Sequence, residues 1–275
     1  MLRRWCLSLA GVSLLTGLIA TASVAGAAPA PAAAHRPGAR HPGRPGLLQL
    51  IRPVAHLIRP GSTGFAPLAH AVSSSNWSGY AASGGHYTKV SASWVEPKGM
   101  CSGSSGSEYS SFWVGLDGYG SSTVEQTGSE VDCSGSSAQY FSWYEMYPSY
   151  PVNFSNTVRP GDHFTASVAY HGSGHYTLVL ADTTRGWRHA VQATLTGASN
   201  SSAEVIAEAP SSTLGVLPLA DFGTVHFRGA TVDGHTIGHF HPTKIVMTNS
   251  SGQAKDSVSG LSSGGKFSAT WLRSN

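Results

Sequence analysis

The chain has 275 residues with a formal charge of +3, and 40% of its residues are hydrophobic, only 11% are charged and 33 are glycine. This composition excludes a coiled coil or long-helix bundle, which needs Ala, Glu, Lys, Leu and Arg in bulk, and its hydrophobic content excludes disorder throughout. Residues 1–75 hold seven arginines and no acid, whereas residues 76–275 hold the other ten basic residues and all 14 acids, a net charge of −4. Because the folded part is not basic, we expect no nucleic acid partner.

Residues 1–27 have the features of a secretory signal peptide. Arg3 and Arg4 precede an apolar stretch over residues 5–22, and residues 25–27 fit the A-x-A pattern of a cleavage site. The alternative is an uncleaved membrane anchor, against which the small residues after the apolar stretch argue. No later segment approaches the ~18 apolar residues of a membrane span. We therefore expect a secreted protein with no stable membrane association after cleavage.

Residues 28–72 form a separate basic segment, rich in Pro, Ala, His and Arg. It contains the repeat Leu-Ile-Arg-Pro at residues 50–53 and 57–60, and proline at this spacing breaks any continuous helix. One interpretation is a largely irregular linker. We favour a propeptide that inhibits the enzyme within the same chain (a zymogen), since an acid-free stretch beside an acidic domain is an electrostatic partner. On this hypothesis acid weakens the attraction and triggers self-processing between about Ala71 and Ser75.

Residues 73–275 are predicted to form one all-β domain. Short runs that alternate between apolar and polar residues are separated by Gly, Ser, Pro or Asp, and none keeps a 3.6-residue period. About a dozen strands in about 200 residues are typical of a β-sandwich or barrel. We predict almost no helix, and strands within 87–95, 110–116, 124–131, 140–147, 164–170, 176–181, 191–196, 203–207, 224–227, 244–248 and 267–271.

Only two cysteines remain once a signal peptide that contains Cys6 is removed. Cys101 and Cys133 both lie in Ser/Gly-rich segments. Two cysteines in an exported protein most simply form one disulfide. A catalytic thiol is the alternative, but neither segment has a neighbouring histidine to activate it.

Two familiar catalytic patterns are not supported by their surroundings. Residues 260–264 match G-x-S-x-G, but no Asp or His follows Ser262, so we interpret the segment as a turn. His235, His239 and His241 would share one face of a strand and could bind zinc. No glutamate base is adjacent, however, and surface histidines explain them equally well, so we expect neither a metal nor a cofactor.

Three of the predicted strands carry acidic residues at alternating positions, and two of them also carry aromatic residues there. Such residues point to one face of a strand, and a face of Trp, Tyr, Gln and Glu suits a groove for an extended polymer. The alternative is that the tryptophans belong to the core and the acids are solvated. The faces are Trp113 with Gly115 and Asp117, Trp143 with Glu145 and Tyr147, and Glu204 with Ile206 and Glu208.

Five segments in this order resemble the glutamic endopeptidase (eqolisin) family, over about residues 76–228. They are Asn76-Trp77-Ser78-Gly79, Trp113-Val114-Gly115-Leu116-Asp117-Gly118, Gln126-Thr127-Gly128, Trp143-Tyr144-Glu145 and Ala203-Glu204. The founding members are secreted fungal acid proteases, and this chain looks like a bacterial-type relative. The resemblance implies a concanavalin A-like sandwich of two large antiparallel sheets, with Gln126 and Glu204 as the catalytic pair.

Two positions depart from the family pattern. Phe141 stands where the family usually has Asp, two residues before the Trp of the W-Y-E motif, and Val205 stands where Trp usually follows the catalytic Glu. Because the missing Asp could hydrogen-bond the site, the departure at Phe141 puts the local network in doubt.

The resemblance implies separate roles for Glu204 and Gln126 in the hydrolysis of peptide bonds in polypeptide substrates. Glu204 would act as general base and then acid, while Gln126 would orient the water and donate to the oxyanion, a contribution of about 3 kcal/mol. Asp117 and Glu145 would orient the site, and Trp77, Trp113 and Trp143 would line the cleft. We expect a monomer. The alternatives are a glycosidase using Glu145 with Glu204, whose carboxyl groups would need to lie about 5 Å apart, and a lectin-like binding module.

Overall fold

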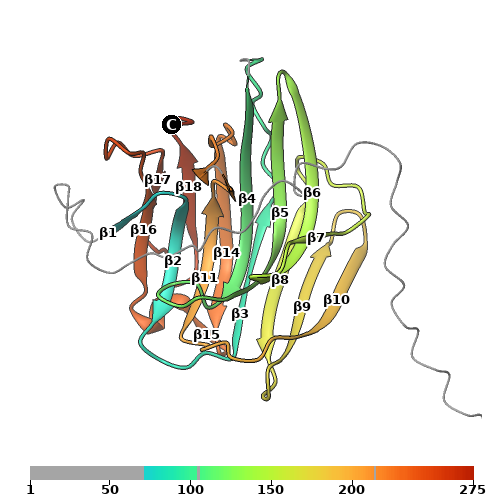
Figure 1. Ribbon diagram of the computed structural model, residues 1–275, viewed down its shortest axis with the longest axis vertical. Coiled ribbons are helices and arrows are strands. Elements are labelled where there is room, and N and C mark those ends of the chain that lie inside the picture. Colours follow the sequence, from blue (N-terminus) through green and yellow to red (C-terminus); the bar gives the residue numbers. More distant parts are fainter. Residues whose placement is uncertain (1–70, 104–105, 214) are drawn as a thin grey trace, which may run out of the picture. The chain divides into compact units, whose positions relative to one another are not determined.

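The computed structural model describes residues 71–103, 106–213 and 215–275, and these form two facing β-sheets (Figure 1). In order across the sheet, the first consists of β1 (Ala71–Ser74), β16 (Thr243–Met247), β2 (Trp77–Ser83), β11 (Ser202–Glu208), β4 (Ser107–Leu116), β5 (Val124–Ser134), β6 (Ser137–Tyr147) and β7 (Val152–Asn153). The second consists of β10 (Trp187–Thr194), β9 (His175–Asp182), β8 (His163–Tyr170), β3 (Lys89–Val95), β14 (Thr224–Val232), β18 (Phe267–Trp271) and β17 (Asp256–Val258), with β15 (His235–Thr236) beside β14.

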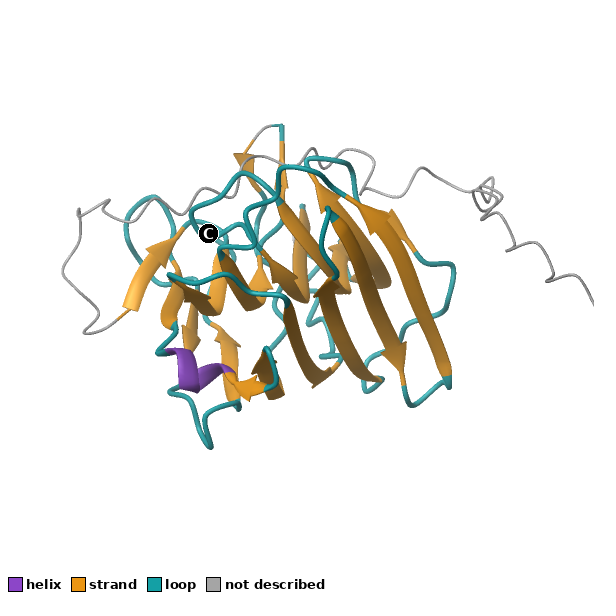
Figure 2. Cartoon of the chain, turned by 90° about the horizontal axis from the view of Figure 1, so that it is seen from below, coloured by secondary structure: helices purple, strands orange, loops and turns teal. Residues whose placement is uncertain are grey.

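The remaining elements are short. A two-stranded sheet pairs β12 (Ser211–Ser212) with β13 (Gly215–Val216), and η2 (Ile237–Phe240), a 3₁₀ turn, is the one helical element among the described residues (Figure 2). The predicted all-β sandwich is therefore confirmed, and each of the eleven predicted strands is present. Within the described residues there is also no helix long and apolar enough to cross a membrane.

The differences from the predicted elements have local causes. Strand β2 was not predicted because its sequence, Trp-Ser-Gly-Tyr-Ala-Ala-Ser, does not alternate between apolar and polar residues. The predicted strand through His235 and His241 is wrong. The chain leaves β15 after two residues, turns through η2, and reaches His241 in the left-handed conformation, with φ of 48°.

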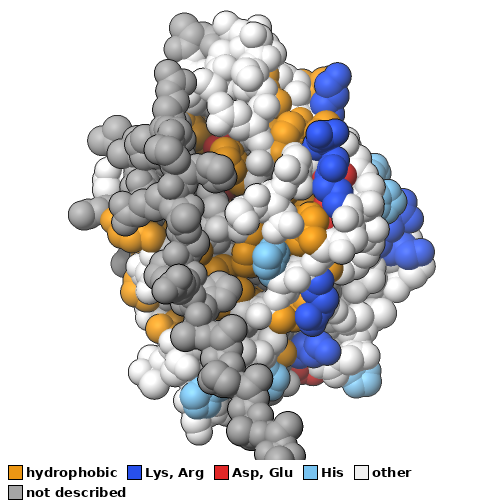
Figure 3. Space-filling view, turned by 90° about the vertical axis from the view of Figure 1, so that its right-hand side faces the viewer, with side chains coloured by type: hydrophobic (Ala, Val, Ile, Leu, Met, Phe, Trp, Pro, Cys, Tyr) orange, Lys and Arg blue, Asp and Glu red, His pale blue; other side chains and the backbone are white. Residues whose placement is uncertain are grey.

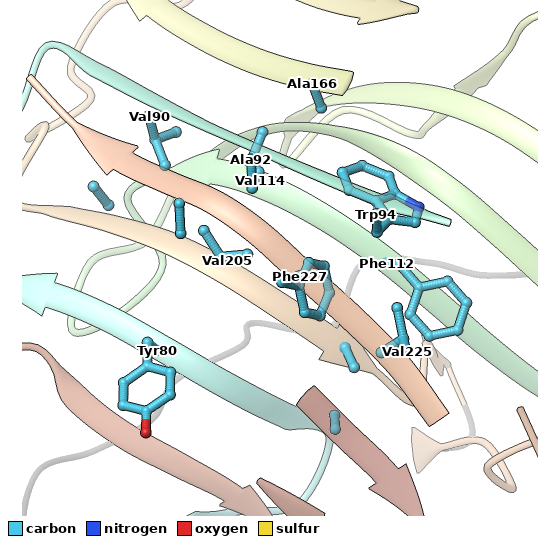
Figure 4. Close-up of a cluster of buried hydrophobic side chains, with 14 of the residues drawn as sticks. Tyr80, Val90, Ala92, Trp94, Phe112, Val114, Ala166, Val205, Val225 and Phe227 are labelled. Carbon is cyan, nitrogen blue, oxygen red and sulfur yellow. The ribbon is translucent and has the colours of Figure 1, made fainter. Parts of the chain in front are cut away.

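The hydrophobic core lies between the sheets. Phe112 and Val114 on β4 and Val205 on β11 point from the first sheet toward Trp94 on β3 and Phe227 on β14 of the second (Figure 4). All five side chains are at most 2% exposed. Since neighbours along a strand alternate in direction, every second residue of β4 and β11 points to the opposite, outer face of the first sheet, where the site lies.

Strand β1 precedes the segments that resemble the glutamic peptidases. It pairs in parallel with β16, with Ala71 opposite Lys244 and Ser74 opposite Met247. The Ser74 hydroxyl oxygen accepts the backbone N–H of Trp77 at 3.0 Å, which ties β1 to the start of β2. The domain boundary expected between residues 72 and 73, and the predicted cut between Ala71 and Ser75, fall within or directly beside this paired strand.

The predicted disulfide is confirmed. Cys101 follows β3 and Cys133 lies near the end of β5, and their sulfurs are bonded with the Cα atoms 5.3 Å apart. The bond closes a loop with a sequence separation of 32. It thereby fixes the connection that brings the chain from the second sheet back to the first.

Candidate active site

One row of paired residues crosses the first sheet. Glu145 on β6 pairs with Gln126 on β5, Gln126 pairs with Gly115 on β4, and Gly115 pairs with Glu204 on β11. Directly opposed residues of antiparallel strands project to the same face. Gln126 and Glu204 therefore point to one face of the sheet, as expected, although 78 positions separate them in the chain.

Gly115 keeps the space between Gln126 and Glu204 free of a side chain. A Cβ atom at this position would lie 3.0 Å from the Trp113 ring and 3.2 Å from the Gln126 Cβ. Both distances are shorter than an ordinary van der Waals contact. The row thus places an amide and a carboxyl group on either side of a residue that has only hydrogen at its α-carbon.

Glu145 fixes the orientation of the Gln126 amide. The Nε2 of Gln126 donates a hydrogen bond of 2.5 Å to Oε2 of Glu145, and Oε1 of Gln126 has no partner among the described residues. Burial raises the pKa of Glu145 to about 8, with a smaller contribution from the charge of Glu208. In acid the Glu145 carboxyl is consequently neutral and accepts the amide proton without carrying charge.

The pair is buried in the full-length chain. Gln126 is 2% exposed and Glu204 is 0% exposed. Neither side chain of the pair is therefore accessible to solvent on the face where the sequence suggested a groove for an extended polymer. Burial raises the pKa of the Glu204 carboxyl well above its usual range, and the Ser202 hydroxyl opposes this rise. A buried Glu204 is protonated in acid, and in that form it cannot take a proton from water.

Asp117 anchors the turn that leads into β11. It follows β4 in the left-handed conformation, with φ of 66°. Its carboxylate accepts the backbone N–H of Asn200 at 2.6 Å, and the N–H and hydroxyl of Ser201 at 2.9 and 3.1 Å. Since Glu204 comes three residues after Ser201, Asp117 helps to set where the strand bearing Glu204 begins.

The three tryptophans lie on the same face as the row, and not in the core between the sheets. Trp77, Trp113 and Trp143 form one buried cluster together with Ile206. The Trp77 and Trp113 rings meet edge to face with centroids 5.0 Å apart. They flank the candidate pair, and each is at most 4% exposed in the full-length chain.

A second group of acids lies on this face; the sequence placed Glu208 there without giving it a role, and it missed Glu130. Glu208 accepts hydrogen bonds from Trp113 Nε1 at 2.8 Å and from Asn76 Nδ2 at 3.1 Å. Glu130 pairs with Ser111, which also pairs with Glu208, so these residues form a parallel row. Burial raises the pKa of Glu208 to about 8. Alternation along β5 from Gln126 to Glu130 was the available signal.

The remaining sequence candidates fall elsewhere. Glu145 and Glu204 are three strands apart, roughly 14 Å between Cα atoms, with Gln126 between them, which does not favour the carboxyl separation of a glycosidase. No cluster of three or more His, Cys, Asp or Glu suited to a metal occurs among the described residues. His235 and His239 stack on each other with centroids 4.7 Å apart, and Ser262 lies in a turn, as predicted, bridged to Lys266.

The two departures from the family pattern lie in different environments. Val205 is 0% exposed and belongs to the core between the sheets, so its side chain points away from the candidate pair. Phe141 pairs with Glu130 on the outer face and is half-buried. Only the change at Phe141 therefore alters the face that carries the site.

Comparisons with known proteins identify the family of the chain and agree with its fold. The family model "Peptidase A4 family" matches residues 75–270. Aspergillopepsin-2 of Aspergillus niger is 32% identical over 213 residues, covering 68% of this chain and 75% of the relative. The structure of scytalido-glutamic peptidase with a transition state analog inhibitor is 26% identical with a TM-score of 0.63, covering 72% of this chain and 98% of that one. Aspergilloglutamic peptidase from Aspergillus niger is 27% identical with a TM-score of 0.54, covering 60% and 99%.

Proposed function

The chain belongs to the peptidase A4 family of glutamic peptidases and is a peptide hydrolase, and from this premise we propose that Gln126 and Glu204 are the catalytic pair of a secreted endopeptidase acting in acid. The observation that carries the proposal is the shared register, in which both residues pair with Gly115 from opposite sides. The disulfide supports an oxidising compartment, and hence secretion.

The mechanism uses one water molecule between the two side chains. Ionised Glu204 takes a proton from the water as its oxygen adds to the peptide carbonyl carbon, and then gives that proton to the leaving nitrogen as the C–N bond breaks. Gln126 gives one N–H to Glu145, which leaves its second N–H for the oxyanion and its Oε1 to accept from the water. An oxyanion donor of this kind contributes about 3 kcal/mol.

Burial determines whether Glu204 can serve as the base. Desolvation is the largest cause of its raised pKa, so opening the site to solvent lowers the pKa toward the ordinary value of about 4.3. The carboxylate then exists in mild acid. We infer that the full-length chain is inactive and that its predicted propeptide, residues 28–72, acts as an intramolecular inhibitor; residues 28–70 of this segment lie outside the described residues.

Two details of the activation hypothesis change with the structure. Burial raises the pKa values of Glu145, Glu204 and Glu208, so these carboxyl groups bind more protons in the buried form of the site. Acid therefore favours the buried form and does not support release of the propeptide driven by acid. A cut between Ala71 and Ser75 would break β1, which is paired with β16. We therefore place the proposed cut on the N-terminal side of Ala71.

The test compares two carboxyl groups on the same strand and face. In the mature enzyme, Glu204→Gln is expected to abolish hydrolysis of a denatured protein in acid. Glu208→Gln should keep most of it, because the Glu208 carboxyl is engaged by Trp113 and Asn76 and lies outside the row that joins Gln126, Gly115 and Glu204. Full-length Glu204→Gln is also expected to remain uncut under any condition in which the unchanged full-length chain processes itself. Appreciable turnover by Glu204→Gln, or an equal loss in both variants, would refute the assignment.

A further inference from the structure

Most acidic side chains of the described residues are buried, whereas nearly all the basic side chains reach the surface. Eleven of the 14 acids are buried, and only Glu108, Asp221 and Asp233 are not. Of the ten Lys and Arg residues among the described residues, Lys255 alone is buried. Residues 76–275 have a net charge of −4, but their surface carries more basic than acidic side chains. Figure 3 shows Lys and Arg side chains in a row along one side of the view, with acidic side chains visible only in small areas.

Part of this charge lies on the outer face of the second sheet. Arg188 on β10 and Arg228 on β14 stand at the two ends of one row of paired residues, roughly 19 Å apart at four strand spacings. Between them the row contains only Ala181, Thr165 and Ser93. Two long cationic side chains thus stand at the two ends of a strip of small ones.

Two adjoining hollows share Arg228. One of about 360 Å³ is lined by Lys89, Arg228 and the hydroxyls of several Ser and Thr residues. The other, of about 240 Å³, is lined by Arg228, His226 and Lys266. The register between β14 and β3 shifts after Arg228, where Gly229 has a φ of 59°.

The cations of this face are not compensated within the described residues. Lys89, Arg188, Arg228 and Lys266 form no salt bridge with any described residue, whereas Arg185 contacts Asp162 and Asp182. The positions that point outward from the strands of this sheet hold no Asp or Glu. They also hold no Phe, Tyr or Trp, as the register and burial show. We call this surface, with its four uncompensated cations, the basic face.

We propose that the basic face binds a linear polysaccharide carrying sulfate or phosphate ester groups. Lys and Arg supply the charge and the Ser and Thr hydroxyls supply hydrogen bonds to anionic oxygens. Without an outward aromatic ring the face lacks the stacking platform that single-stranded nucleic acids use. The choice of sulfate or phosphate over carboxylate rests on the proposed activity in acid, where carboxylates with a pKa of about 4 lose their charge.

The basic face and the catalytic row lie on opposite outer faces of the sandwich. Gln126 and Glu204 project from the first sheet, away from the core, and Arg188 and Arg228 project from the second. A polymer bound to the basic face therefore does not cover Gln126 and Glu204. We expect a bound polymer to hold the peptidase at a charged surface while peptide hydrolysis continues.

The test measures binding of fluorescent dextran sulfate to the full chain, with neutral dextran, duplex DNA and phosphatidylglycerol vesicles as separate probes. Arg188→Gln/Arg228→Gln is expected to weaken dextran sulfate binding about tenfold or more and to reduce the slope of log Kd against log salt by about 1 to 2. Lys98→Gln/Lys244→Gln removes two cations that lie outside the basic face and is the matched control. Because both arginines are exposed, circular dichroism should show an unchanged fold.

The outcomes separate this proposal from the catalytic one. The basic face would be refuted as the binding site if Arg188→Gln/Arg228→Gln bound dextran sulfate as tightly as the unchanged chain. An equal loss of binding in Lys98→Gln/Lys244→Gln would refute it as well. Tighter binding of duplex DNA or vesicles at equal charge would refute the polysaccharide. None of these readouts requires proteolytic activity, so a failure here leaves the assignment of Gln126 and Glu204 untouched, and a failure of that assignment leaves the binding result intact.

Discussion

Gln126 and Glu204 are brought together by a shared partner, since each pairs with Gly115 of the strand between them. Strand spacing sets the distance between their Cα atoms at roughly 10 Å. Two side chains that lean toward each other over this gap can hold a water and a carbonyl group between them. The geometry therefore depends on the residue in the middle as much as on the pair.

Gly115→Ala should remove activity while leaving the fold in place. The added Cβ would lie 3.0 Å from the Trp113 ring and 3.2 Å from both the Gln126 Cβ and the Glu125 carbonyl oxygen. We expect kcat/KM to fall by about 100-fold or more, because misplacing reacting groups by about 1 Å costs that much. The measurement is kcat/KM for hydrolysis of a peptide in acid. The control is Gly260→Ala, whose Cβ meets nothing within 4 Å; similar kcat/KM values for the two variants would count against the account.

Glu145 should act through the Gln126 amide and without charge. Its Oε2 accepts the hydrogen bond from Nε2 of Gln126, and Glu145→Gln keeps an uncharged oxygen acceptor at this position. We expect Glu145→Gln to retain most of kcat, and Glu145→Ala to lose about 10-fold or more because a buried donor is left unsatisfied at about 1–3 kcal/mol. The pH profile of kcat for the three proteins tests this. An equal loss in both variants would show that the negative charge is required.

Asp117 should affect both stability and turnover. Asp117→Ala removes the acceptor for the backbone N–H groups of Asn200 and Ser201, so we expect a loss of roughly 2–4 kcal/mol in the free energy of unfolding. Well below the unfolding temperature, kcat should still fall, since the turn leads into the strand bearing Glu204.

Asp233 provides the matched control for Asp117. It also has a positive φ, 47°, and its Oδ1 accepts the N–H groups of Thr88 and Lys89. Asp233→Ala should lower stability without lowering kcat of the folded enzyme. If Asp117→Ala changed only the unfolding temperature, Asp117 would be structural and not a positioning residue.

Glu125 should make the domain less stable as the pH rises. It is 0% exposed, one residue before Gln126, and burial raises its pKa to about 8, helped by the charge of Asp117. Because the folded pKa lies above the unfolded value of about 4.3, its contribution is fully present below pH 4 and is lost as the pH rises through 8. Glu125→Gln should therefore narrow the difference in Tm between pH 4 and pH 8 by several degrees. Half-buried Glu108→Gln is the control, and an unchanged difference in Glu125→Gln would contradict this role.

Alternation of apolar and polar residues predicted eleven strands, including β5 and β11, which are buried on both faces. It missed β2, whose sequence Trp-Ser-Gly-Tyr-Ala-Ala-Ser does not alternate, and it wrongly continued a strand from His235 into η2. The motifs identified Gln126 and Glu204, but only the register with Gly115 explains their proximity. The sequence also did not predict that most acidic side chains are buried, because the number of charges along the chain does not show which carboxyl groups are covered.

The most direct measurement is a double-mutant cycle on the pair. We would compare kcat of Gln126→Ala, Glu204→Gln and the double variant on one peptide in acid. Groups that act as a unit on the same water are non-additive, so the double variant should be no slower than the slower single variant. Losses that multiply, giving a double variant slower than either by the full product, would show that the two residues act independently.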